Sequence, residues 1–170
     1  QMDDYGNYFD VMGSHKYSMH INAFYKDIMG WFDPNEKVML SDSKEKVTIH
    51  PLESQRKGVA KTAIYKIPAG EFSRPEPFNT KMDYAFYVEY RQAMGFDKHL
   101  EHPYLNSNTK GLMICMTRRQ GDGFINSWLL DMSPDDVVYK KAPADIATND
   151  YIDEDDHHET TLNAGKTFYD

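Results

Sequence analysis

Residues 84–91 read YAFYVEYR, and this stretch decides the fold class. Its side chains alternate with a period of two, which is the repeat of a β-strand that presents different residues on its two faces. One face carries Tyr84, Phe86, Val88 and Tyr90, and the other carries Ala85, Tyr87, Glu89 and Arg91. We therefore expect a central strand whose aromatic face is turned toward the interior.

Other segments on both sides of this strand show the same alternation and are separated by turn residues. They are residues 38–40, 47–52, 62–67, 112–117, 127–132 and 137–139. Between them, residues 70–83 and 95–111 are polar or contain proline, which indicates loops. Short strands at this spacing predict a mostly β chain that forms an antiparallel β-sandwich.

The pattern changes before Pro34, where helical spacing replaces alternation. Asn22 is a favoured helix N-cap residue and Gly30 is a stop signal. Apolar residues recur between them at spacings of three and four: Ile21, Phe24, Ile28 and Trp31. We predict a short helix buried along this stripe, and two units at residues 1–36 and 37–170.

Residues 5–31, YGNYFDVMGSHKYSMHINAFYKDIMGW, resemble the end of the catalytic domain in metzincin-type zinc metallopeptidases of the gametolysin and immune inhibitor A kind. FDVMG at residues 9–13 is similar to the methionine turn of that family. HINAFYKDIMGW at residues 20–31 is similar to the helix that closes the domain. A weaker resemblance continues in AFYVEYRQAMGFD at residues 85–97 and LNAGKTFYD at residues 162–170, which are similar to strands and turns that follow the catalytic domain.

The resemblance implies supporting roles for several residues near this turn. Met12 would form the apolar floor below the zinc ion, and Gly13 would complete the turn. His15 and His20 would line the wall of the substrate pocket. Ser14 departs from those metzincins that have a tyrosine at this position, so the donor that would stabilise an oxyanion is not identified.

The sequence does not contain the zinc-binding motif HExxHxxGxxH of these peptidases, and none of its 7 histidines begins an HExxH segment. In the parent enzyme the resemblance implies zinc-assisted hydrolysis, with three histidines as ligands and a glutamate as general base. We therefore expect one part of a secreted zinc-dependent endopeptidase that acts on a peptide or protein, with its zinc ligands in an upstream catalytic segment. The isolated chain is expected to be inactive.

Composition excludes other classes of protein. A net charge of −8 and a pI near 5.3 argue against binding to nucleic acid. No apolar run reaches the length of a transmembrane helix. Cys115 is the only cysteine and lies in the apolar run GLMICM, so burial is favoured and an internal disulfide is excluded. An extracytoplasmic location is implied by the resemblance alone.

Two further groups of residues are candidate metal ligands. His99 and His102 are three residues apart, but Pro103 follows them and favours a loop. Asp153 and Asp155 belong to an acidic run that could attract calcium. This run lacks the spaced DxDxDG arrangement, so a solvated loop is favoured.

Glu89 and Arg91 point to the same face of their strand, which favours a structural ion-pair network over a catalytic pair. The alternative to the peptidase hypothesis is a non-catalytic β-sandwich module that binds protein or glycan through its aromatic and loop surfaces.

Overall fold

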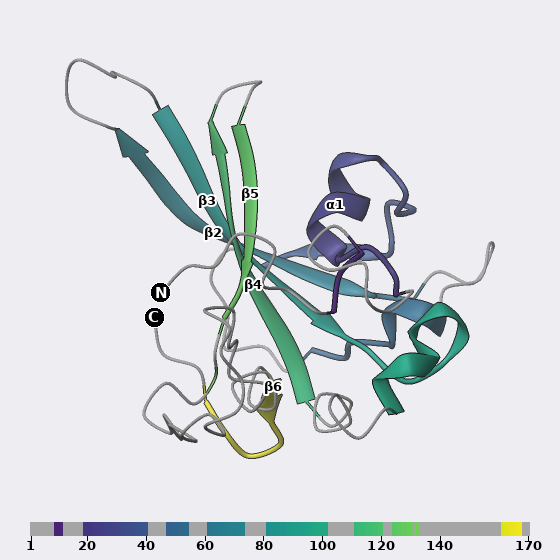
Figure 1. Cartoon of the computed structure of the whole chain (residues 1–170). Helices are drawn as coiled ribbons and strands as arrows, with labels where there is room; N and C mark the ends of the chain where they lie inside the picture. Colours follow the sequence, from purple (N-terminus) through teal and green to yellow (C-terminus); the bar gives the residue numbers. More distant parts are fainter. Residues whose placement is uncertain are drawn as a thin grey trace, which may run out of the picture.

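The computed structural model describes residues 9–11, 19–40, 47–54, 61–73, 81–101, 111–120, 124–130, 132 and 161–167. Within these residues the chain is mostly β, as predicted, and its strands form one six-stranded sheet (Figure 1). The strands are β1 (Lys37–Met39), β2 (Ile64–Ser73), β3 (Lys81–Tyr90), β4 (Gly111–Gln120), β5 (Phe124–Leu129) and β6 (Thr161–Asn163). The helices are α1 (Ala23–Ile28) and the 3₁₀ helices η1 (Leu52–Ser54) and η2 (Gly95–Glu101).

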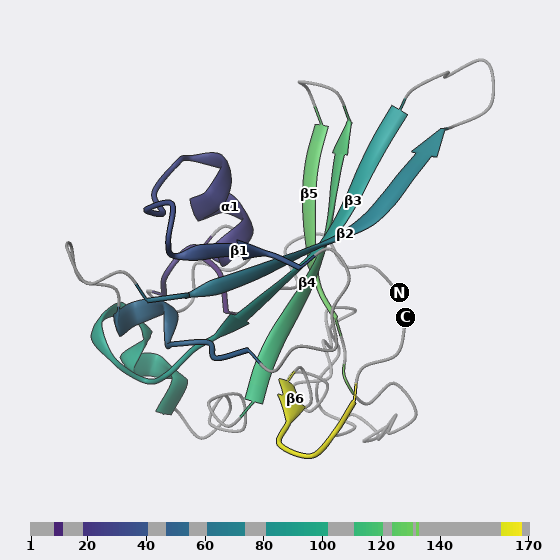
Figure 2. The same cartoon turned by 180° about the vertical axis from the view of Figure 1, so that it is seen from behind.

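The sheet has the strand order β1-β2-β3-β4-β5, and β6 pairs with the end of β4 beyond β5. The pairings are antiparallel except for β1 with β2, which is parallel. The strand predicted from residues 84–91 is β3, and it lies in the centre as expected. Figures 1 and 2 show that the sheet is strongly twisted and that α1 lies beside it. A second sheet, which a sandwich requires, stays a prediction.

Some predicted boundaries are wrong. Residues 47–52 do not form a strand, because Pro51 has no N–H for a ladder and its carbonyl accepts hydrogen bonds from the N–H and the hydroxyl of Ser54. The resulting turn is η1. The two predicted loops are also shorter than expected. Strands β2 and β3 extend into residues 70–83, and η2 occupies the first part of residues 95–111. The predicted strand at residues 137–139 lies outside the described residues.

Helix α1 begins as predicted, but it buries a different face. Asn22 Oδ1 accepts a hydrogen bond from the Tyr25 N–H at 3.1 Å, and Gly30 ends the helix with a φ of 68°. Phe24 is buried, whereas Ile28 and Trp31 are 44% and 60% exposed. The helix ends at Ile28, so the predicted stripe is only partly helical and its last residues do not reach the sheet.

The helix and the sheet share a hydrophobic core on one face of the sheet. Its buried members are Ala23, Phe24, Leu52, Ala63, Ile64, Ala85 and Tyr87. The face of β3 that was expected to be outside, which carries Tyr87 and Glu89, is therefore buried, each residue being 2% exposed. Phe86 and Val88 are buried on the opposite face in a separate cluster, so both faces of β3 are covered. The division at residue 36 stays a prediction.

Neither the α-helix nor the 3₁₀ helices found in the described part of the chain are long and apolar enough to cross a membrane.

Candidate functional site

A buried arginine at the end of β3 is the centre of the candidate site. Arg91 is fully buried, and its guanidinium forms a two-pronged pair with the carboxylate of Asp97, a buried residue of η2. Nε donates to Asp97 Oδ2 at 2.8 Å and Nη2 donates to Asp97 Oδ1 at 2.7 Å. Paired hydrogen bonds of this kind fix both the distance and the orientation of the two groups.

The same arginine also holds the N-terminal part of the chain. Arg91 Nη1 donates to the carbonyl of Phe9, and Nη2 donates to the carbonyl of His20 at 3.1 Å. The His20 N–H donates in turn to Asp97 Oδ1 at 2.7 Å. One arginine–aspartate pair therefore fixes the backbone at two points, on either side of residues 10–19.

Glu89 extends this anchor to the first turn of α1. Its Oε2 accepts a hydrogen bond from the Ala23 N–H at 2.6 Å, and its Oε1 lies 3.6 Å from Arg91 Nη1. The predicted ion pair between Glu89 and Arg91 is therefore present in the structure. The pair joins β3 to the N-terminal segment and α1 rather than to a neighbouring strand.

Glu53 of η1 completes the cluster and was missed by sequence reasoning. Its side chain is 1% exposed, Oε2 accepts from the Gln92 N–H at 3.1 Å, and Oε1 lies 3.4 Å from Arg91 Nε. Nothing in the residues around Glu53 indicated this role, because its contacts are with residues distant in the sequence. In the sequence, Asp97 was indicated only by the resemblance of residues 85–97 to a segment that follows the catalytic domain in metzincins.

Burial and neighbouring charge shift the ionisation of these groups. Burial raises the pKa of Glu53 to about 8, and the hydrogen bond to Asp97 and the charge of Asp97 act in the same direction. Burial alone would raise the pKa of Asp97 as well, but hydrogen bonds from Glu53 and Arg91 lower it to about 2. Burial also raises the pKa of Glu89, against the opposing charge of Arg91.

Two polar residues of the N-terminal half border the cluster. Lys26 of α1 is 8% exposed, and its burial lowers the pKa of the ammonium group, although Glu89 opposes this effect. His20 is half-buried and its ring meets Phe96 edge-on, with the ring centroids 5.3 Å apart. Burial and then the nearby Lys26 lower the pKa of His20, which favours the neutral imidazole.

A second polar contact fixes the middle of α1. The Tyr87 hydroxyl donates to Asp27 Oδ2 at 2.6 Å, and Lys37 Nζ donates to Asp27 Oδ1 at 2.5 Å. Asp27 therefore ties the helix to β3 and β1 at once. Together with Glu89 at its N-terminus, the helix is held at two points.

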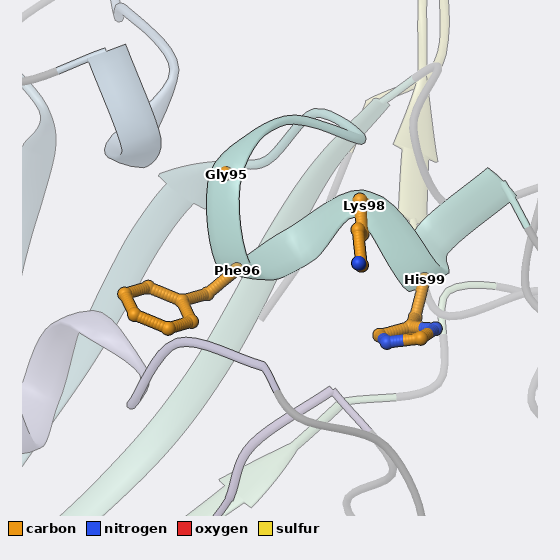
Figure 3. Close-up of a pocket in the computed structure, with 4 residues that line it drawn as sticks. All are labelled: Gly95, Phe96, Lys98 and His99. Carbon is orange, nitrogen blue, oxygen red and sulfur yellow. The ribbon is translucent and has the colours of Figure 1, made fainter.

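An open hollow lies beside η2. It has a volume of about 470 Å³ and is lined by Gly95, Phe96, Lys98 and His99, of which Phe96 is 68% exposed. Figure 3 shows that the side chains of Lys98 and His99 point in similar directions from η2, whereas the Phe96 ring extends away from them. Exposed aromatic rings held on an anchored backbone are common in binding surfaces.

Only two of the predicted site residues are described, His20 and His99. His20 borders the arginine cluster, whereas His99 lines the hollow beside η2. The other candidates, Met12, Gly13, His15, His102, Asp153 and Asp155, lie outside the described residues. Within the described ranges no three His, Cys, Asp or Glu side chains are grouped as metal ligands.

Cys115 is expected to be chemically inert in the folded chain. It is 2% exposed, and burial raises the pKa of its thiol, so the reactive thiolate is suppressed. A thiol reagent such as dithionitrobenzoate should label about one thiol per chain in urea and almost none under native conditions. Rapid labelling of the native chain would contradict the buried position in β4.

No protein-family model matches this chain, and neither a curated protein nor a solved structure matches it. Its function is therefore inferred from its residues and their geometry.

Proposed function

We propose that this chain is the methionine-turn end and the adjoining β module of a secreted zinc endopeptidase. Two features support this proposal: the resemblance of residues 5–31 to the end of a metzincin catalytic domain, and the way β3 holds both flanks of that segment. In this role the chain supports a catalytic centre whose zinc ligands belong to another segment. The substrate class would be a peptide or protein.

The hydrogen bonds from Arg91 to the carbonyls of Phe9 and His20 carry the proposal. A metal site needs its surrounding shell held in place, because small displacements weaken both metal binding and catalysis. A fully buried guanidinium fixed by Asp97 provides a rigid frame for the two ends of residues 10–19. The β module would then keep the turn at Met12 in position below the metal.

Under this proposal the zinc ligands belong to another segment, so no step of peptide hydrolysis is assigned to this chain. Zinc would bind upstream residues in the parent protein, and calcium at residues 150–156 stays a prediction. His20, with its lowered pKa, would act as a neutral wall residue.

An activity assay tests the isolated chain directly. We expect that the purified chain with added zinc hydrolyses casein no faster than a matched sample containing a chelator. The physical reason is that the chain has no HExxH segment to hold zinc and to supply a general base. Turnover that requires zinc and is abolished by the chelator would refute the assignment of the ligands to another segment.

The parent assignment has a separate test in the coding sequence before the codon for Gln1. An in-frame HExxHxxGxxH motif within about a hundred residues is expected for a metallopeptidase of this kind. An unrelated domain or a stop codon in that interval would overturn the proposal.

The hollow beside η2 favours a second candidate, a non-catalytic module that binds protein or glycan. Phe96 exposes most of its ring there, next to Lys98 and His99. Binding of a peptide or a glycan that Phe96→Ala abolishes, without a change in stability, would support this module. Such binding would not by itself exclude the peptidase assignment.

A further inference from the structure

We propose that Glu53 keeps its carboxyl proton at neutral pH and donates it to Asp97 Oδ2, so that this shared proton joins η1 to η2. Loss of the proton in alkaline solution would place a second negative charge beside Asp97 and separate the two 3₁₀ helices. The shared proton involves only described residues and does not depend on a role in a metallopeptidase.

The donors of Arg91 are already committed to other groups. A guanidinium has five N–H bonds. Nε donates to Asp97, Nη2 donates to Asp97 and to His20, and Nη1 donates to Phe9 and faces Glu89 at 3.6 Å. Although Arg91 Nε lies 3.4 Å from Glu53 Oε1, its single hydrogen points to Asp97 at 2.8 Å. Arg91 therefore has no N–H left for Glu53.

Glu53 Oε1 consequently has no hydrogen-bond donor, although it is buried. An ionised carboxylate oxygen in that state would lose its hydration without replacement, which is strongly unfavourable. On Asp97, Oδ1 accepts two hydrogen bonds, from the His20 N–H and from Arg91, whereas Oδ2 accepts only one from Arg91. A proton on Glu53 Oε1 would donate to Asp97 Oδ2. It would give Oε1 a hydrogen-bond partner and fill the remaining acceptor position of Oδ2.

The charge balance of the cluster also favours a protonated Glu53. The carboxyl groups in or next to it are Glu53 of η1, Asp97 of η2, Glu89 of β3 and Asp10 of the N-terminal segment. The cations that face them are Arg91, after β3, and Lys26 of α1. Carboxyl groups outnumber cations, and burial lowers the pKa of Lys26, so full ionisation would leave an excess of buried negative charge. Protonation of Glu53 reduces that excess.

The effect on stability has a definite sign. Burial and Asp97 raise the pKa of Glu53 from 4.5 to about 8. The folded state therefore binds the proton more tightly than the unfolded state does. This contribution to stability is complete below pH 4.5, declines as the pH rises and is lost above the folded value. Across that window one linked proton lowers the ratio of folded to unfolded chain by up to about tenfold per pH unit.

Carbon NMR of the side-chain carboxyls tests the protonation state in the wild-type chain. The Cδ resonances of Glu53, Glu89 and Glu101 are assigned by through-bond correlation, so the assignment does not depend on any variant folding. We expect Glu53 Cδ to show a protonated carboxyl at pH 6.5 and to titrate at higher pH. An ionised Glu53 at pH 6.5 would overturn the inference.

The variant Glu53→Gln tests the linkage. Its amide can donate to Asp97 and accept from the Gln92 N–H, so it mimics the protonated acid and cannot ionise. We expect it to be about as stable as the wild type near pH 5 and to have a ratio of folded to unfolded chain up to about a thousandfold higher than the wild type near pH 9, with Glu101→Gln as the matched control. Identical pH dependence in the wild type and Glu53→Gln would contradict the proposal. A Glu53→Gln chain that fails to fold at pH 5 would do the same.

Discussion

Replacing Arg91 with methionine should lower the free energy of unfolding by about 3–5 kcal/mol or prevent folding, because it removes one partner from a buried ion pair. Methionine has a similar length but no N–H groups. Asp97 and Glu89 would remain buried beside it without their cation, and the carbonyls of Phe9 and His20 would lose a donor. Urea denaturation followed by far-ultraviolet circular dichroism measures the loss.

Two other variants separate charge from geometry at this position. Arg91→Lys keeps the positive charge but cannot form the planar two-pronged contact with Asp97, so its stability should lie between that of the wild type and that of Arg91→Met. Arg119→Met removes an exposed arginine from β4 and should change stability by less than about 0.5 kcal/mol. Equal stability of Arg91→Met and Arg119→Met would show that the buried cluster does not hold the chain together.

The parts of the fold that follow from local physics were predictable. The period-two pattern of residues 84–91 predicted β3 and its central place, because alternation of side chains is the repeat of a strand, but it did not predict that both faces of β3 are covered. Asn22 and Gly30 marked the ends of α1, since capping and a positive φ depend on the residue itself. These signals do not require knowledge of what packs against the segment.

The candidate site was less predictable because its partners are distant in the sequence. Glu89 and Arg91 could be placed on one face of a strand. That the face is covered by α1, η1 and η2 could not be read from the sequence. Nothing near Glu53 indicates a buried carboxyl, and its environment depends on Asp97 and on the donors of Arg91. The shared proton is therefore visible only in three dimensions.

The parallel pairing of β1 with β2 was missed for a related reason. Alternation shows that a segment is a strand but does not show the direction of its neighbour. Here β1 pairs in parallel with β2, and this pairing joins segments whose relative direction is set by tertiary contacts rather than by their own side-chain pattern.

Replacing Phe24 with alanine should destabilise the chain by about 3–5 kcal/mol, the usual range for a buried phenylalanine. Phe24 is 4% exposed, and its ring meets the ring of Tyr87 at a centroid distance of 5.3 Å. The cavity would lie between α1 and β3, where Leu52 and Ile64 also pack. Thermal denaturation and urea titration would measure the loss.

Ile28→Ala and Trp31→Ala are the matched controls, because a helical stripe predicted that Phe24, Ile28 and Trp31 would pack alike. The structure exposes Ile28 and Trp31 by 44% and 60%, so each replacement should change stability by less than about 0.5 kcal/mol. Amide exchange adds a local measurement. In Phe24→Ala the Ala23 N–H, which donates to Glu89, should exchange faster as α1 detaches, whereas in the two controls it should stay protected. Equal losses in all three variants would contradict the exposure of Ile28 and Trp31 and would show that the whole predicted stripe is packed.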